Sequence, residues 1–87
     1  MNNNNISTEY ERVSALKIGK YNEQLGQIIY YYIAQIEMVK YRHDNGEVVS
    51  QKFVSISDTG KVKKFDTEIE ALQDAIETRD AMNGGEW

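Results

Sequence analysis

The chain has 87 residues, enough for one domain with a single modest core. It contains no cysteine, which excludes disulfides, thiolate catalysis and cysteine-ligated metal sites. Acids outnumber bases 14 to 10, and the net charge of -4 opposes binding to phosphate backbones, so nucleic acid is a disfavoured partner. No apolar run approaches the roughly 18 residues of a membrane span, and we expect a soluble, cytoplasmic protein with no membrane contact.

The N-terminal part of the sequence gives mixed signals. Residues 1–8, which include four consecutive asparagines, are expected to form a disordered tail ahead of a single α+β domain over residues 9–87. Thr8-Glu9-Tyr10-Glu11 has the spacing of a helical capping box, whereas residues 12–19 also suit a strand. We favour the strand, because Gly19 and the residues after it would turn the chain into the next element.

Residues 27–42 carry the strongest strand signal, a concentration of β-branched and aromatic residues. The segment is long for a strand, so a bulge is expected in it. Side chains alternate between the two faces of a strand. One face would carry Tyr30, Tyr32, Ala34, Ile36 and Met38, and this set is the better core candidate. The opposite face would carry Tyr31, Ile33, Gln35, Glu37, Val39 and Tyr41.

The middle of the chain predicts an antiparallel meander. The run from His43 to Gly46 predicts a hairpin, with Asn45-Gly46 as the two-residue turn signal. Residues 47–57 would form the return strand. Asp58-Thr59-Gly60 would then turn the chain into a further strand over residues 61–65. The fold class is therefore α+β, a small antiparallel sheet of three or four strands packed against one C-terminal helix.

The sequence period changes to that of a helix after Asp66. Thr67 and Glu70 have capping-box spacing, and the helix should run to about Met82, before Asn83 and Gly84. One side is expected to pack on the sheet, and it carries Ile69, Leu72, Ile76, Ala71, Ala75 and Met82. Another side carries an acidic stripe made of Glu70, Asp74 and Glu77.

Catalytic and ligand-binding signals are weak. His43 is the single histidine and flanks a turn, where a surface role is the usual one. The acids after it lack the ligand spacing of a calcium loop, because position 52 is a lysine. No phosphate-binding glycine loop and no nucleophile elbow occur in the sequence. We therefore predict no catalytic residue, no cofactor and no metal, and a chain that is not an enzyme.

Two surfaces are candidates for partner binding. The acidic stripe of Glu70, Asp74 and Glu77 is most often a solvated helix face, but it could also engage a basic protein surface. Tyr31 and Tyr41 fall on the sheet face opposite Tyr30 and Tyr32, so in a sheet covered by one helix they should lie near solvent. Aromatic side chains in such a place either contact protein or stack on nucleic-acid bases.

The sequence favours a non-enzymatic protein-binding domain of the adaptor or inhibitor type. The order of sheet and then helix is similar to that of several groups of small proteins, among them phage-encoded inhibitors and compact accessory proteins of bacteria, which is a likeness of fold alone. A phage or mobile-element origin would fit this expectation. The expected partner is another protein with a basic surface. The first alternative is a β-sheet module that binds single-stranded nucleic acid through Tyr31, Tyr41 and the lysines of residues 61–64. The second is a structural protein that self-associates, for example as a homodimer, through a long aromatic edge strand.

Overall fold

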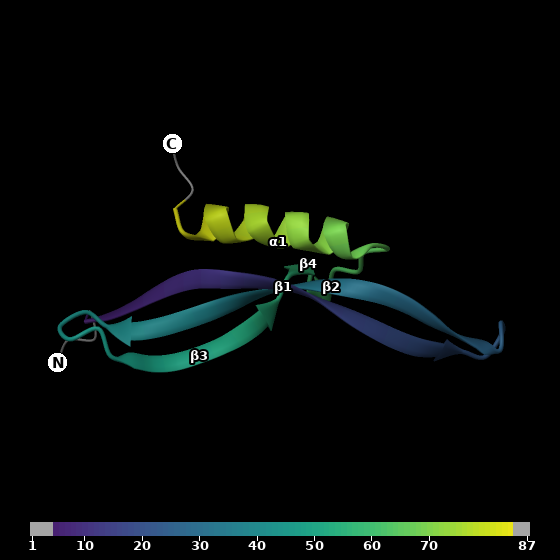
Figure 1. The fold of residues 1–87 in the computed structure, drawn as a ribbon, viewed down its shortest axis with the longest axis horizontal. Coiled ribbons are helices and arrows are strands. Elements are labelled where there is room, and N and C mark those ends of the chain that lie inside the picture. Colours follow the sequence, from purple (N-terminus) through teal and green to yellow (C-terminus); the bar gives the residue numbers. More distant parts are fainter. Residues whose placement is uncertain (1–4, 85–87) are drawn as a thin grey trace.

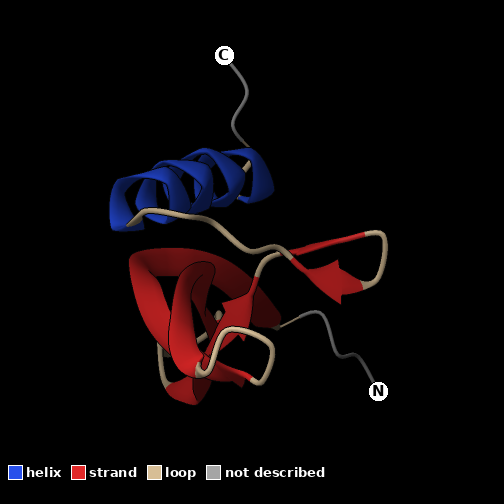
Figure 2. Cartoon of the chain, turned by 90° about the vertical axis from the view of Figure 1, so that its right-hand side faces the viewer, coloured by secondary structure: helices blue, strands red, loops and turns tan. Residues whose placement is uncertain are grey.

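The computed structural model describes residues 5–84 and contains two layers (Figure 1). One layer is an antiparallel sheet of three strands in the order β1-β2-β3, formed by Ile6–Asn22, Gln27–Arg42 and Val48–Ser55. The other is a single helix, α1 (Glu68–Met82), that lies along one face of the sheet. Figure 2, which looks along the strands, shows the helix on one side and the opposite sheet face uncovered. The predicted α+β meander with a C-terminal helix is confirmed.

Of the two alternatives for the N-terminal segment, helix or strand, the structure shows the strand, β1. The strand is longer than predicted and begins at Ile6, so Ile6 to Thr8 belong to the sheet and not to a disordered tail. The rest of that predicted tail, residues 1–4, lies outside the described residues. β2 has the predicted bounds, but the bulges lie on its two partners. Glu11 and Arg12 oppose Glu37 alone, and β3 gains a residue between Val48 and Ser50.

The hairpin between β2 and β3 is confirmed, although its turn is wider than Asn45-Gly46 alone. The Arg42 N–H donates to the Glu47 carbonyl, which leaves residues 43–46 in the loop, and only Gly46 has a positive φ there. The predicted strand over residues 61–65 does not extend the meander. Lys61–Val62 (β5) pairs instead with Ser57–Asp58 (β4) as a separate small hairpin. Phe65 then returns to β2 through a pair of 2.8 Å backbone hydrogen bonds with Tyr32.

The core is small and lies where the helix crosses β1 and β2. Its fully buried members are two alanines on the helix and two residues of β2: Ala71, Ala75, Ala34 and Ile36. Partly buried side chains surround them: Tyr10, Val13, Ala15, Tyr32, Ile56 and Phe65. Because alanine side chains are short, the helix backbone can approach the sheet closely at this point. The expected core face of β2 is thus confirmed at Tyr32, Ala34 and Ile36 but is wrong at Tyr30, which lies beyond the helix and is 54% exposed.

The helix begins as predicted but packs on the sheet through a narrower side. The Thr67 hydroxyl accepts a hydrogen bond from the Glu70 N–H and caps the N-terminus. Ala71 and Ala75 face the sheet, whereas Ile69 is 64% exposed and Ile76 is 40% exposed. Met82, at the end of the helix, is 50% exposed. The expectation that Ile69, Ile76 and Met82 pack on the sheet is therefore wrong. Because Ala71 and Ala75 form the side of the helix that contacts the sheet, the two isoleucines lie on the flank of the helix.

The C-terminal end of the helix also closes part of the free edge of β1. The Asn83 side chain accepts from the Tyr10 N–H at 3.0 Å and donates to the Tyr10 carbonyl at 2.6 Å. One residue further, Arg79 donates to the Glu11 carbonyl at 2.9 Å. These contacts occupy backbone groups of an edge strand that would otherwise be free to pair with another strand.

The fold predicts that volume at the alanine contact is tightly limited. Ala75→Leu should lower the free energy of unfolding by about 1–3 kcal/mol, because the helix must move away from β2 to admit the larger side chain. The matched control is Ala81→Leu in the same helix, where the side chain is exposed and the change should stay within about 0.5 kcal/mol. Denaturant unfolding of both variants measures this difference. Equal effects would contradict the close packing.

Candidate interaction surfaces

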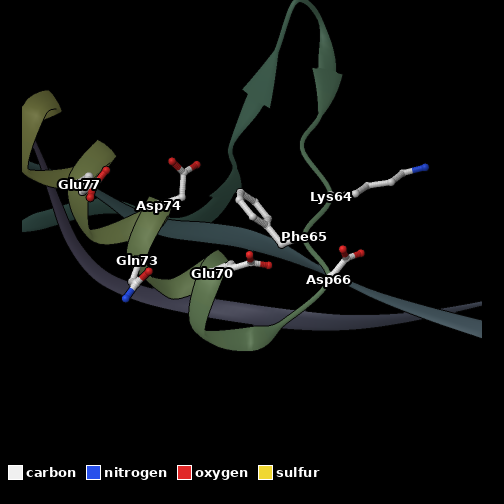
Figure 3. Close-up of a pocket in the computed structure, with 7 residues that line it drawn as sticks. All are labelled: Lys64, Phe65, Asp66, Glu70, Gln73, Asp74 and Glu77. Carbon is white, nitrogen blue, oxygen red and sulfur yellow. The ribbon is translucent and has the colours of Figure 1, made fainter.

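The predicted acidic stripe lines an open hollow beside the helix (Figure 3). The hollow has a volume of about 430 Å³ and lies between α1 and the segment that leads from β5 into the helix. Its lining, which we call the acidic groove, consists of Lys64, Phe65, Asp66, Glu70, Gln73, Asp74 and Glu77. Figure 3 shows the Lys64 side chain pointing away from the helix. The structure therefore brings the three stripe carboxylates together and adds that of Asp66.

The negative charge of one stripe residue, Asp74, is balanced by a lysine within the chain. The Lys63 Nζ lies 3.1 Å from Asp74 Oδ2, and this ammonium also sits 5.4 Å from the centre of the Phe65 ring. The ion pair between Lys63 and Asp74 thus links the segment after β5 to the helix. Glu70 and Glu77, both exposed, are the stripe residues whose charges face solvent.

Tyr31 and Tyr41 lie on the sheet face that the helix leaves uncovered, which we call the open face. The Lys64 Nζ lies 5.0 Å from the centre of the Tyr31 ring. The Tyr41 hydroxyl donates to Glu9 at 3.1 Å, and this hydrogen bond to a carboxylate raises the pKa of Tyr41. Ten residues separate the two tyrosines along β2, or roughly 33 Å of strand. The five predicted partner-binding residues therefore form separate surfaces and not one site.

A charged cluster at the centre of the open face was not predicted. Glu37 is only 2% exposed, and its carboxylate accepts from Arg12 Nε at 2.9 Å and from Arg12 Nη2 at 3.0 Å. Gln51 on β3 donates to the same carboxylate. The Arg12 side chain is 71% exposed, and its guanidinium carbon lies 5.9 Å from the centre of the Phe53 ring. The three side chains come from the three strands of the sheet.

This cluster fixes an arginine at the centre of the open face. The hydrogen bonds from Arg12 and then from Gln51 lower the pKa of Glu37 from 4.5 to about 2, so the carboxylate is ionised at neutral pH. The two-point contact with Glu37 holds the guanidinium plane in one orientation. The contact uses Nε and Nη2 of Arg12, and the side chain stays 71% exposed.

The sequence contained one signal for this cluster. Glu37 is the only acid in the strongly apolar run of residues 27–42, and a carboxylate in a half-buried strand needs a partner. Its partner could not be read from the sequence, because the bulge at Glu11 and Arg12 shifts the side-chain alternation of β1 by one residue. Alternation counted from Tyr10 would place Arg12 on the helix side, whereas alternation counted from Val13 and Ala15 places it on the opposite face.

A third surface is the distal half of the β1-β2 hairpin. This arm, residues 16–31, extends past the core residues Ala15 and Tyr32 and beyond the N-terminal end of the helix (Figure 1). The molecule measures 56 × 29 × 21 Å, and its radius of gyration of 16.5 Å exceeds the roughly 12 Å expected for a compact chain of this length. Six large apolar side chains of the arm are exposed: Leu16, Tyr21, Leu25, Ile28, Ile29 and Tyr30.

Within residues 5–84, no three acidic or histidine side chains gather in a way that could hold a metal ion. Across the same residues, no helix has the length and apolar character to cross a membrane. Comparison with protein-family models, with curated proteins and with solved structures found no match to this chain.

The Glu37 cluster predicts a specific dependence of stability on pH. Because the pKa of Glu37 is lower in the folded chain than its ordinary value of 4.5, its contribution is complete above that value and is lost as the pH falls towards about 2. Glu37→Gln should therefore destabilise the fold at neutral pH, and the difference from wild type should shrink in acid. Denaturant midpoints at about pH 7 and pH 3 measure this change.

Glu11→Gln, which removes a carboxylate from the adjacent bulge, is the control for the loss of one acid. A wild-type advantage over Glu37→Gln that stays constant between the two pH values would contradict the cluster.

Proposed function

We propose that this chain is a small, non-enzymatic protein-binding domain of the adaptor or inhibitor type, and that the open face of the sheet is its main contact surface. The observation that supports the proposal is the Arg12, Glu37 and Gln51 cluster, which lies on the sheet face opposite the helix and keeps the Arg12 side chain 71% exposed. Arginine and aromatic side chains are the residues most enriched at the energetic centres of protein interfaces. Here Arg12 is held in place before binding, so little side-chain entropy is lost when a partner docks.

The surroundings of Arg12 suit a mixed apolar and charged partner. Phe53 lies beside the guanidinium and is 42% exposed, and Leu16 on β1 is 44% exposed. Further along the same face, Tyr31 and Lys64 form a second aromatic and basic pair. A partner surface that carries a carboxylate within an apolar patch would complement this arrangement.

The acidic groove supports a second contact, with a basic partner surface. Its exposed carboxylates, Glu70 and Glu77, lie in the helix layer, on the other side of the sheet from Arg12. The two surfaces therefore suit two separate partners, and an adaptor that joins two proteins would use one surface for each.

Tyr30 and Tyr31 provide a matched test of the open face, because they are adjacent and point to opposite faces. Tyr31→Ala should reduce retention of the partner about tenfold in affinity capture from a lysate of the source organism, while Tyr30→Ala should leave it near the wild-type level. Nuclease treatment of the lysate should not change the result. Equal loss for both variants, or retention that nuclease abolishes, would contradict protein binding through this face.

The groove has its own charge-reversal test. Glu70→Lys combined with Glu77→Lys should release a basic partner while keeping the fold, since both side chains are exposed. Asp44→Lys combined with Asp58→Lys makes the same change in net charge at two exposed positions away from the groove, one in the loop after β2 and one in β4, and serves as the control. Release by the control pair as well would indicate a general charge effect and remove the groove from the proposal.

The second candidate function is binding of single-stranded nucleic acid on the same open face. The lysine beside Tyr31 and the arginine beside Phe53 favour it, because bases stack on aromatic rings while cations contact the backbone. The net charge of -4 opposes it.

Fluorescence anisotropy with short single strands at low salt tests this second function. Binding that weakens with added salt and with Lys64→Gln would support it, and no binding at low salt would remove it.

A further inference from the structure

The free edge of β1 is guarded along only part of its length. Asn83 and Arg79 occupy the edge at Tyr10 and Glu11, and the bulge follows immediately. Beyond the bulge, β1 continues as the outermost strand of the sheet to Asn22. Bulges and covering side chains are the usual protections of an edge strand, and along the arm neither is present within the described residues.

The backbone hydrogen bonds of β2 show which residues of this edge are unpaired. Tyr32 and Ala34 direct their backbone groups away from β1, to Phe65 and Ile56. Alternate residues of a strand direct these groups to opposite edges, so Tyr31 and Ile33 bond to β1 through their partners Ile18 and Leu16. The residues of β1 between and beside these partners therefore present free N–H and C=O groups at the outer edge: Ala15, Lys17, Gly19 and Tyr21.

We propose that a second copy of this chain pairs with this edge, β1 against β1, in a symmetric antiparallel dimer. A twofold axis normal to the sheet at Ile18 sets Ala15 opposite the partner's Tyr21 and Lys17 opposite the partner's Gly19. All four outward residues then form hydrogen-bonded pairs. In this arrangement the two arms lie side by side, and the two bodies lie at opposite ends of a six-stranded sheet.

This register also covers the apolar flank of the helix. At about 100° per residue, Ile69 and Ile76 lie on the same side of α1 as Arg79, the side that reaches β1. Side chains at the outward positions of β1 face the helix, as Ala15 does in the core. The partner's Tyr21, opposite Ala15, would therefore enter beside this flank, with the arm tip and its exposed Leu25 following. The dimer thus accounts for isoleucines that the single chain leaves exposed.

The distribution of charge favours contact between arms over contact between bodies. The arm carries Lys17, Lys20 and Glu23, a net charge of +1, while the rest of the chain carries -5. In the register centred on Ile18, Lys17 faces the partner's Gly19 and Lys20 faces the partner's Leu16. A register centred on Lys17 would instead set two lysines directly opposite, which is unfavourable. The acidic bodies stay far apart.

Sedimentation equilibrium over a wide concentration range tests the dimer directly. The weight-average mass should rise with concentration from the 10.0 kDa of one chain towards about twice that value. A mass of one chain at every concentration would overturn the proposal.

A single introduced thiol tests the register, because the chain has no cysteine of its own. Ile18→Cys should form a disulfide between copies on mild oxidation, since the two residues would face each other across the axis at a distance that a disulfide can span. Val48→Cys, an exposed position on β3, is the control and should stay monomeric on denaturing gels. Cross-linking at Val48 and not at Ile18 would place the contact elsewhere and overturn the proposal.

Two further pairs of variants test separately the backbone edge of β1 and the apolar flank of the helix. Lys17→Pro removes an outward N–H and should abolish the dimer, whereas Lys17→Ala keeps the edge and should keep the dimer. Ile69→Lys, at a side chain exposed in the single chain, should weaken dimerisation about tenfold or more without loss of folding, while Gln73→Lys on the groove side should not. A dimer that tolerates both Lys17→Pro and Ile69→Lys would contradict the proposed interface.

Discussion

The close packing of the helix on β1 and β2 determines which surfaces of the molecule remain exposed to solvent. Ala71 and Ala75 meet Ala34 and Ile36, and these four residues are the fully buried core between helix and sheet. A helix of 15 residues is only about 22 Å long, whereas the molecule extends over 56 Å. The helix therefore covers one face of the sheet at one end. The opposite face, the arm and the apolar flank of the helix remain available for other contacts.

The open face is organised around a charge, which is unusual for the surface of a sheet. Glu37 belongs to the most apolar strand, and its burial would be costly without Arg12 and Gln51. The bulge in β1 lets both Tyr10 and Val13 face the helix while Glu11 and Arg12 lie opposite Glu37. The cluster thus links the three strands and at the same time presents a fixed guanidinium to solvent. A single local irregularity serves both the fold and the surface on which the proposed function depends.

Self-pairing through the arm and binding through the open face are compatible. Pairing uses the edge of β1, and in the antiparallel register the open faces of two copies would lie on one side of a continuous sheet. Two Arg12 clusters would then be displayed by one dimer, which would strengthen binding to a partner with repeated sites. The acidic grooves would remain free on the helix side.

Some features were predictable from local patterns and others depended on packing. The bounds of β2 followed from its β-branched and aromatic content, and the helix start followed from Thr67 and Glu70, because these signals act over a few residues. The orientation of the helix was not predictable, since Ile69, Leu72 and Ile76 look like a core face until the two alanines set the distance to the sheet. The acidic stripe was predictable as a group of residues on one side of the helix. The ion pair between Asp74 and Lys63 was not predictable, because it depends on how the segment after β5 packs on the helix. Arg12 could not be assigned to a face without knowledge of the bulge.

Solvent accessibility of methyl groups in solution is the most direct measure of how much of the sheet the helix covers. A paramagnetic reagent dissolved in the buffer broadens NMR signals of exposed methyl groups and leaves buried ones sharp. The methyl groups of Ile28 on the arm and Val48 on β3, which are 51% and 54% exposed, should broaden strongly, while those of Ile36, which is 1% exposed, should stay sharp. Equal protection of Ile28, Val48 and Ile36 would contradict a sheet that is covered at one end of one face.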